Sequence, residues 1–189
     1  MGKVILLSGS PRMKSNTVEA LNICAEAIKE NSIDTEVISL KGLKIESCMA
    51  CNGCVGTGNC VLGDGLETVI DKIKEADGFI PAAPVYFGTA RGDIMSALQR
   101  IGKVSKGNGK FLSWMVGGPI AVARRAGQTL TLQEMAMFFL INDMIIVGSD
   151  YWNTIFALAE ETVTDDAEGV ATIQKFGENV ANLIKKIKD

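Results

Sequence analysis

"KVILLSG" (residues 3–9), followed by "SNTVEALNICAEAIKEN" (15–31), decides the fold class of this chain. The first stretch is a short, continuous apolar run, which is typical of a strand buried on both faces. The second stretch has apolar residues at helical spacing, namely Val18, Leu21, Ile23, Ala25 and Ile28. A buried strand that leads directly into an amphipathic helix is the first half of an α/β unit.

The same alternation continues to the end of the chain. Further apolar runs indicate strands at 34–40, 78–84, 110–118 and 144–149, and helical periodicity indicates helices at 65–77, 91–104, 127–143 and 166–189. Parallel neighbouring strands need crossover connections, which helices usually supply. The pattern therefore predicts an α/β domain with a parallel sheet between two helical layers. A length of 189 residues predicts one domain, residues 1–189.

The composition excludes several classes of function. Hydrophobic residues make up 47 % of the chain and charged residues 22 %, as in ordinary globular proteins. The net charge of −3 argues against a nucleic-acid partner, because no excess of basic residues balances phosphates. We expect no membrane partner, since the apolar run near the start is too short for a signal or a span. A cytosolic location follows, in which cysteines stay reduced.

The chain contains no histidine. This excludes Ser–His–Asp and Cys–His nucleophilic machinery and any metal site that histidine would hold. The chemistry must therefore depend on cysteines, carboxylates, backbone groups or a bound cofactor.

The least regular connection is 149–166, which contains Tyr151, Trp152 and Phe156. These aromatic residues are suitable for covering a site or a partner surface. Local core packing is the interpretation that we favour.

A phosphate site is expected where the first strand ends, in "SGSPRMKSNT" (8–17). Free amides and the positive end of the helix dipole attract a phosphate there. The side chains and amides that we expect to bind it belong to Ser10, Arg12, Lys14, Ser15, Asn16 and Thr17. Only Gly9 matches the three glycines of the dinucleotide fingerprint, and Met13 replaces the second glycine of a Walker A loop. A loop rich in hydroxyls favours a mononucleotide.

Two further strand ends are suited to a flat heteroaromatic ring. In "APVYFG" (83–88) an extended, proline-stiffened backbone exposes peptide groups beside an aromatic side chain. In "MVGGP" (115–119) paired glycines leave room for a planar ligand. The residues expected to contact the ring are Pro84, Val85, Tyr86, Phe87, Gly88, Gly117 and Gly118.

Together with a cysteine-rich segment, these loops and "RRAGQTLTLQEMAMFFLINDMIIVGS" (124–149) resemble the flavodoxin-like NAD(P)H-dependent FMN reductases, and most closely the iron–sulfur flavoproteins. The resemblance covers about residues 3–153. It implies a flavodoxin-like three-layer sandwich with a five-stranded parallel sheet in the order 2-1-3-4-5. It also implies FMN as the cofactor, with the phosphate at 10–17 and the ring against 84–88 and 117–118, and a homodimer or homotetramer.

The cysteine-rich segment is "CMACNGCVGTGNC" (48–60), in the loop after the second strand. Its Cys48, Cys51, Cys54 and Cys60 have spacings that allow four thiolates to surround a [4Fe–4S] cluster. Gly53, Gly56 and Gly58 are expected to supply the turns. Zinc, a CxxC redox pair and cluster-free thiols remain as alternatives. Cys24 is expected to be a small core residue.

The sequence thus predicts a redox flavoprotein that carries FMN and a [4Fe–4S] cluster. Electrons would come from a donor such as ferredoxin or NAD(P)H and pass to a small-molecule acceptor. Because the cysteine loop follows the second strand, we expect it at the same edge of the sheet as the flavin. One alternative is a cluster-free NAD(P)H-dependent FMN or quinone reductase. Another is a non-catalytic flavin- or nucleotide-binding module with a zinc-stiffened loop.

Overall fold

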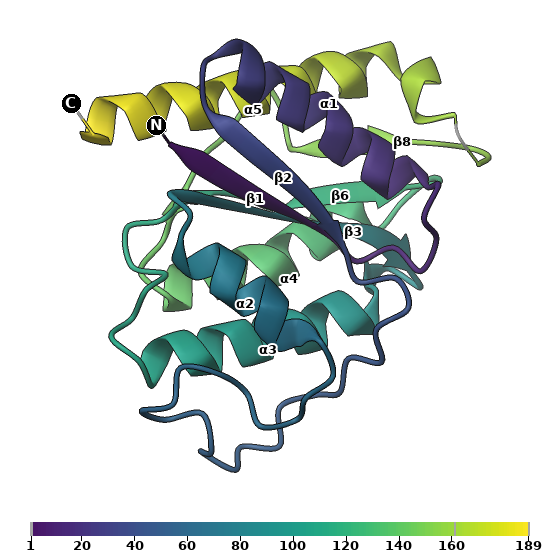
Figure 1. The fold of residues 1–189 in the computed structure, drawn as a ribbon. Helices are drawn as coiled ribbons and strands as arrows, with labels where there is room; N and C mark the ends of the chain where they lie inside the picture. The colour runs from purple at the N-terminus through teal and green to yellow at the C-terminus, as the bar shows by residue number, and fades with distance from the viewer. Residues whose placement is uncertain (1, 161, 189) are drawn as a thin grey trace.

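A computed structural model describes residues 2–160 and 162–188 as a sheet between two helical layers (Figure 1). The strands are β1 (Lys3–Ser8), β2 (Asp34–Ser39), β3 (Gly78–Tyr86), β4 (Thr89–Ala90), β5 (Val116–Gly117), β6 (Ile120–Ala123), β7 (Ile145–Ile146) and β8 (Thr154–Phe156). The helices are α1 (Asn16–Glu30), α2 (Leu66–Lys74), α3 (Gly92–Lys106), α4 (Gln128–Ile141), α5 (Ala167–Lys188) and the short 3-10 helix η1 (Val163–Asp165).

The sheet has the predicted parallel order, with additional short strands. Its main path runs β2-β1-β3-β5-β7, while β6 continues beside β3 and β8 beside β6. All of these pairs are parallel, and β4 pairs antiparallel with the end of β3. The expected flavodoxin-like order of five strand positions is therefore confirmed. The fourth and fifth positions are each divided into two short strands.

The prediction of one continuous strand over 110–118 was wrong at both ends. Residues 107–114 form turns, and Lys110 and Trp114 have left-handed φ values of 56° and 64°. The strand starts only at Val116, and it resumes as β6 after Pro119, which has no N–H to donate to a ladder. The carboxyl end of this strand position is therefore Ala123, five residues beyond the predicted end.

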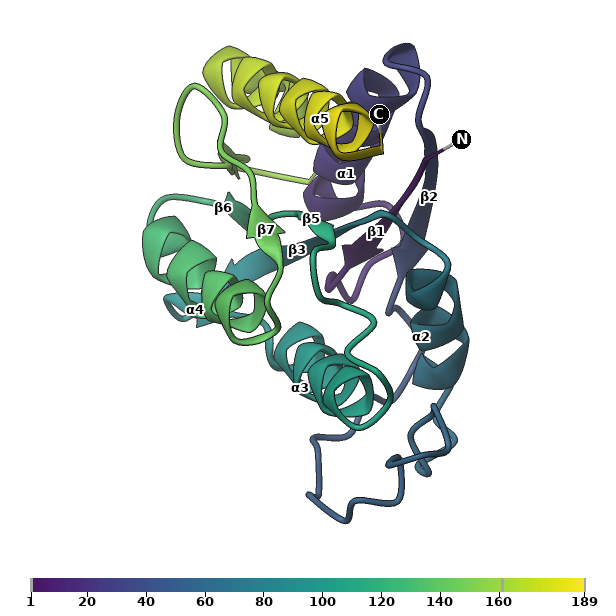
Figure 2. The ribbon, with the colours of Figure 1, turned by 90° about the vertical axis from the view of Figure 1, so that its left-hand side faces the viewer.

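Alternate residues of β1 enter two separate cores. Val4 and Leu6 pack on the side covered by α1 and α5, whereas Ile5 and Leu7 pack on the side covered by α2, α3 and α4. Figures 1 and 2 show the same two layers on opposite sides of the sheet. Burial on both faces explains why the strands are continuously apolar in the sequence.

The aromatic residues of the 149–166 connection do not pack in the core. Tyr151 is 58 % exposed and Trp152 is 55 % exposed, and their ring centroids lie 4.8 Å apart. Only Phe156, in β8, is partly buried. The expectation of local core packing is therefore wrong for Tyr151 and Trp152, which contact each other on the surface.

Candidate functional site

The first loop at the carboxyl edge of the sheet is held in shape by its own hydroxyl groups. The backbone N–H of Ser10 donates to the Ser8 hydroxyl at 3.2 Å, and that of Arg12 donates to the Ser10 hydroxyl at 3.2 Å. Gly9 is required by a close approach, since a Cβ there would lie 2.6 Å from the Cβ of Ile94 on α3. The loop therefore passes directly over the start of α3.

Helix α1 begins at Asn16, at the end of this loop, so its first turn lies near the carboxyl edge of the sheet. Ser15 caps the helix, because its hydroxyl accepts the backbone N–H of Val18 at 3.2 Å. Thr17 is buried in the first turn. The positive end of the helix dipole and its free amides make this position suitable for an anion.

The side chain of Asn16 is occupied by contacts within the protein. Its Nδ2 donates to the carbonyl of Ala159 at 2.7 Å, and its Oδ1 accepts the backbone N–H groups of Thr162 and Val163 at 3.0 and 3.1 Å. These bonds tie the connection after β8 to the phosphate loop. Cofactor binding by Asn16 stays a prediction, in which the backbone N–H of Asn16, rather than its side chain, would contact the cofactor.

The second loop, after β3, meets the loop after β6. Gly127, with φ +89°, lies so close that a Cβ would stand 2.8 Å from the Cα of Gly88 and 2.8 Å from Val85. The two glycines let the two backbones touch at the edge of the sheet. The exposed Phe87, with φ 51°, lies at the tip of the β3–β4 hairpin.

A cavity of about 150 Å³ lies where these loops converge. It gathers eight of the residues predicted to bind the cofactor: Ser10, Arg12, Ser15, Asn16, Thr17, Pro84, Val85 and Tyr86. Residues that the sequence analysis missed also line it, namely Pro11, Val122, Ala123, Arg124 and Ala157. Lys14, Phe87 and Gly88 do not line it. Any part that these three play in binding stays a prediction.

Gly117 and Gly118 lie inside the fold rather than at this edge. A Cβ on Gly117 would stand 1.9 Å from the carbonyl oxygen of Phe79 in β3, and one on Gly118 would stand 3.2 Å from the ring of Phe176 in α5. These glycines allow close packing between elements. The loop that reaches the edge at this strand position contains Arg124. The sequence signal that could have identified this loop is the pair Arg124 and Arg125, directly after the apolar run of residues 120–123.

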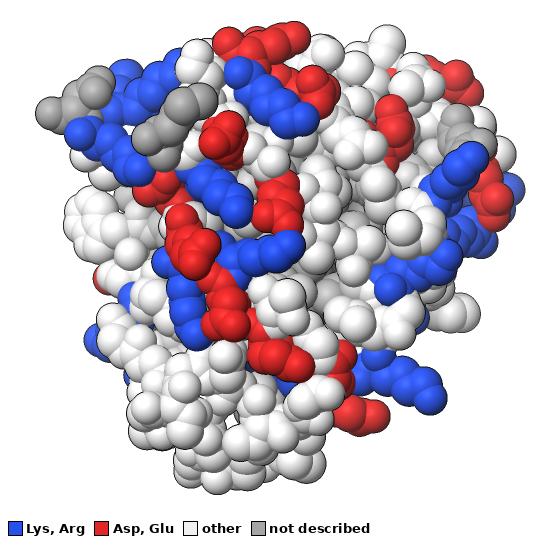
Figure 3. Space-filling model, viewed as in Figure 1, with Lys and Arg blue, Asp and Glu red and all other residues white. Residues whose placement is uncertain are grey.

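Two arginines lie at the cavity. Arg12 forms a surface ion pair with Glu160 at 2.6 Å, and Arg124 donates through Nε to the carbonyl of Leu158 at 3.3 Å. In Figure 3, basic side chains gather at the right-hand edge of the molecule, where the strands end in Figure 1. The positive charge suits an anionic group such as a phosphate.

The cysteine loop is fastened to one face of α3 and to the turn that follows it. Ser96 shares a hydrogen bond of 2.9 Å with Ser47. Asn108 donates to the carbonyl of Cys54 at 2.8 Å and accepts the N–H of Gly58 at 2.9 Å. These anchors define the position of the loop.

The turns between the cysteines use Ala50 and Asn52, which were not expected, as well as the expected Gly56 and Gly58. Ala50 and Asn52 have left-handed φ values of 53° and 59°, as do Gly56 and Gly58 at 75° and 80°. Gly53 also lies in a turn, as predicted, although its φ is not positive; the backbone N–H of Val55 closes this turn by donating to the carbonyl of Asn52 at 3.0 Å. Gly53 permits close packing, since a Cβ there would stand 2.8 Å from Val61 and 3.7 Å from the Cys51 sulfur.

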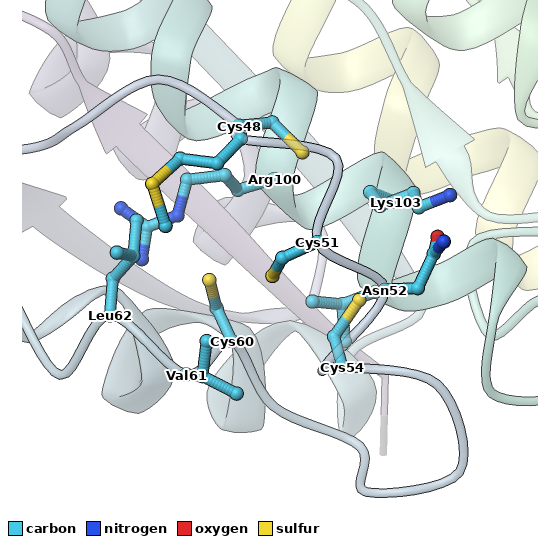
Figure 4. Close-up of a pocket in the computed structure, with 11 residues that line it drawn as sticks. Cys48, Cys51, Asn52, Cys54, Cys60, Val61, Leu62, Arg100 and Lys103 are labelled. Carbon is cyan, nitrogen blue, oxygen red and sulfur yellow. The ribbon is translucent and has the colours of Figure 1, made fainter.

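All four loop cysteines line one small cavity of about 20 Å³, together with Arg100 and Lys103 of α3 (Figure 4). Every cysteine of the chain is a free thiol. Among residues 2–160 and 162–188, no three Cys, Asp or Glu side chains come together closely enough to hold a single metal ion. Cys24 lies apart from the cavity in α1, where burial raises the pKa of its thiol, as expected for a core residue.

Arg100 and Asp64 form a buried ion pair beside the thiols. The pKa of Asp64 is lowered, chiefly because its carboxylate accepts hydrogen bonds from Arg100. Burial opposes the charge of Arg100, but the Asp64 carboxylate and the neighbouring Cys60 sulfur outweigh it and raise the pKa of the guanidinium. Both groups are therefore charged at neutral pH.

The sequence analysis expected the cysteine loop at the same edge of the sheet as the flavin. The cysteine cavity does not lie there. The loop leaves that edge after β2, but its cysteines lie against α3, and Figures 1 and 2 show the loop beyond the lower helices. The two cavities share no lining residue. The long connection of residues 40–65 carries the thiols away from the strand end, because its anchors are on α3.

The comparison with protein families agrees with this geometry. The model of the NADPH-dependent FMN reductase family matches residues 2–159. The chain belongs to this family. An NADPH-dependent FMN reductase fold places its loops at the carboxyl edge of a parallel sheet, where the cavity with Ser10, Arg12 and Thr17 is found.

Similar proteins place this family member near the iron–sulfur flavoproteins. An iron–sulfur flavoprotein of Methanocaldococcus jannaschii is 37 % identical over 98 % of this chain and 99 % of its own length. Among solved structures, RosB with a bound 8-demethyl-8-formylriboflavin-5'-phosphate has a TM-score of 0.78 at 15 % identity, covering 100 % of this chain and 81 % of RosB. A flavodoxin from the domain Archaea has a TM-score of 0.64 at 14 % identity, covering 97 % and 99 %.

This member of the FMN reductase family is therefore a flavoprotein oxidoreductase of flavodoxin-like fold. The cradle of hydroxyls, helix amides and touching glycines fits FMN. In the described ranges, 2–160 and 162–188, no helix is both long and apolar enough to cross a membrane.

Proposed function

We propose that the protein transfers electrons through FMN at the edge of the sheet and a [4Fe–4S] cluster at the cysteine loop. The observation that carries the proposal is the convergence of Cys48, Cys51, Cys54 and Cys60 on one cavity in a member of an FMN-binding family. The relatives that are named iron–sulfur flavoproteins support it.

The residues at the FMN cavity divide into two groups. Ser10, Ser15 and Thr17, together with the N-terminal amides of α1, would hold the phosphate, and Arg12 and Arg124 would balance its charge. Pro84, Val85 and Tyr86 would bind the ring, with Gly88 and Gly127 keeping the backbones close. Bound FMN exchanges electrons singly or in pairs.

The cysteine loop fits a cluster better than a zinc ion. Four thiolates on one zinc, each about 2.3 Å from the metal, must gather around a single point. The thiols here line one cavity, but no three of them in the described structure are gathered in that way. In a [4Fe–4S] cluster each thiolate binds a different iron, so the sulfurs stand around a larger body.

Electrons would enter from a donor such as ferredoxin or NAD(P)H and leave to a small-molecule acceptor, in the cytoplasm. Because the two cavities are separate within one chain, we propose that transfer between cluster and flavin crosses between the subunits of a homodimer or homotetramer. The exposed apolar side chains of α4, Leu130, Met137, Leu140 and Ile141, are the surface for such an assembly.

A cluster-free NAD(P)H-dependent FMN or quinone reductase is the second candidate. It is favoured by the cavity at the flavin edge, which includes no residue of the cysteine loop. In that case a hydride would pass from NAD(P)H directly to the flavin.

Anaerobic purification tests the proposal. The wild-type protein should be brown, contain close to four irons and four sulfides per chain, and absorb broadly at about 400 nm. A Cys54→Ser variant should lose the iron but keep its FMN. A wild-type protein that is purely yellow, holds no iron and oxidises NADPH would favour the cluster-free reductase instead.

A further inference from the structure

Arg100, in the middle of α3, is a fully buried cation, with 1 % of its side chain exposed. Burying a guanidinium costs free energy unless it is paired. The partner is Asp64, whose Oδ1 accepts a hydrogen bond from Nη2 at 2.8 Å and whose Oδ2 contacts Nη1. The fold therefore maintains a buried charge at this point.

The pair closes the base of the cysteine loop. Nη1 of Arg100 donates to the carbonyl of Glu46 at 3.3 Å, and Oδ2 of Asp64 accepts the backbone N–H of Glu46 at 3.3 Å. Glu46 precedes the first loop cysteine and Asp64 follows the last. Taken alone, these bonds describe a structural clamp.

A clamp does not explain the Nε donor of Arg100. Its Nε–H is buried and has no hydrogen-bond partner in the described structure. Buried polar groups without partners are rare and call for a specific cause. Arg100 lines the thiol cavity, and its guanidinium lies beside Cys60 (Figure 4).

The charges around the cavity have one sign. Arg100 and Lys103, one turn apart on α3, both line it, while none of the Asp and Glu residues that the structure describes does. Asp64 contacts Arg100 from outside the lining. The cavity is therefore arranged for an anion, and an iron–sulfur cluster held by four thiolates is a net anion whose negative charge grows by one on reduction.

We propose that Arg100 is a positioning residue of the cluster site, which donates a hydrogen bond to the Cys60 thiolate and favours the reduced cluster. This inference rests on the proposed function. When an external reductant delivers one electron, no bond is formed or broken, and the fixed positive charge stabilises the added negative charge. Asp64 holds the guanidinium in place and moderates its effect. Hydrogen bonds to sulfur and local charge are known determinants of cluster potentials.

The test compares the reduction potentials of anaerobically reconstituted variants that retain FMN. Arg100→Met should lower the potential by about 59 mV, which is a tenfold fall in the ratio of reduced to oxidised cluster at fixed potential. Asp64→Asn, which removes the opposing negative charge, should raise it. Arg100→Lys, which keeps the charge but loses the Nε donor, should fall between Arg100→Met and wild type. Potentials are read from redox titrations followed by electron paramagnetic resonance.

Opposite shifts of the reduction potential in Arg100→Met and Asp64→Asn would distinguish an electrostatic role of Arg100 from a purely structural one. Either single change loosens the base of the loop, so a clamp alone would reduce iron content in both variants without moving the potential in opposite directions. If Arg100→Met fails to hold the cluster, the double variant Arg100→Met/Asp64→Leu leaves no buried charge unpaired and should still show a lowered potential. Lys106→Gln, an exposed change on the same helix outside the thiol cavity, is the control and should leave the potential unchanged.

The outcomes distinguish this inference from the function on which it rests. Wild-type protein that takes up no iron overturns the proposed function and the inference together. A wild-type cluster whose potential is unmoved by Arg100→Met, or moved in the same direction by Asp64→Asn, overturns the inference alone.

Discussion

At the scale of single residues, local sequence patterns did not reveal the contacts of two arginines at the candidate sites, Arg124 and Arg100. Arg124 reaches the FMN cavity only because β6 extends to Ala123, and Arg100 meets Asp64 across 36 positions of sequence. In both cases the residue type is visible in the sequence. Its partner is supplied by the fold.

Arg124→Gln should weaken FMN binding by roughly tenfold, because a hydrogen bond to a charged group contributes about 1.5–3 kcal/mol. Fluorescence titration of flavin-free protein with FMN measures this change. Arg125→Gln is the matched control, since the exposed Arg125 does not line the cavity, and it should bind FMN as wild type does. Equal weakening in both variants would contradict a specific role for Arg124.

Asp64 should make stability depend on pH in a defined direction. Its folded pKa is lowered by Arg100, so its stabilisation is complete above the ordinary carboxyl pKa of about 3.9 and is lost as the pH falls through the lower folded value. Asp64→Asn should therefore reduce the free energy of unfolding by about 3 kcal/mol at neutral pH, since it breaks a buried pair. The difference from wild type should shrink below pH 4.

Urea unfolding of both proteins across this pH range measures the difference. Asp150→Asn, at an exposed carboxylate, serves as the control. A difference between wild type and Asp64→Asn that stays constant from pH 7 to strongly acidic conditions would show that the ion pair does not stabilise the fold.

At the scale of elements, α3 and the turn after it are the support of the cysteine loop. Ser96, Arg100 and Val104 are spaced by four residues and therefore share one face of α3, on which the loop lies. Asn108, in the turn after the helix, holds the loop from the same side. The periodicity is readable in the sequence. The loop contacts are not, because they join residues about fifty positions apart.

Asn108→Ala should loosen the loop without disturbing the flavin site. It removes hydrogen bonds to the Cys54 carbonyl at 2.8 Å, the Val104 carbonyl at 2.7 Å and the Gly58 N–H at 2.9 Å. Leaving such groups unpaired costs about 1–3 kcal/mol. We expect faster proteolytic cleavage within 48–60, lower iron content after reconstitution and unchanged FMN affinity.

The control for this change is Asn22→Ala on the exposed surface of α1, whose side-chain bond to Glu19 is long at 3.5 Å. It should leave both cleavage and iron content unchanged. Wild-type cleavage rates in Asn108→Ala would show that other contacts hold the loop.

At the scale of the whole molecule, α4 has apolar residues on its outer face as well as its inner face. Figure 2 shows α4 at the margin of its layer, and Leu140 and Ile141 are 61 % and 67 % exposed. A helix that is apolar all round is normally buried, which supports its proposed place in an interface between copies.

Leu140→Lys should therefore shift the protein toward monomers, since it places a charge in the proposed apolar interface. Sedimentation velocity over a range of concentrations measures the assembly. Ile187→Lys, at an exposed apolar residue of α5, should leave the assembly unchanged. If neither substitution changes the sedimentation coefficient, α4 is not the interface.

The sequence by itself determined the alternation of strands and helices, because buried parallel strands and amphipathic helices leave local, periodic patterns. The family, and the order of the sheet that it implies, came from the resemblance of the loop motifs and the cysteine segment to the FMN reductases. The sequence also identified eight of the residues that line the cavity at the edge of the sheet, since strand ends at one edge of a parallel sheet converge. Only the tertiary structure decided that the third edge loop is the one with Arg124, that Gly117 and Gly118 are packing residues, and that the thiols lie against α3. These features depend on where distant segments pack, and packing between distant residues leaves no periodic pattern along the chain.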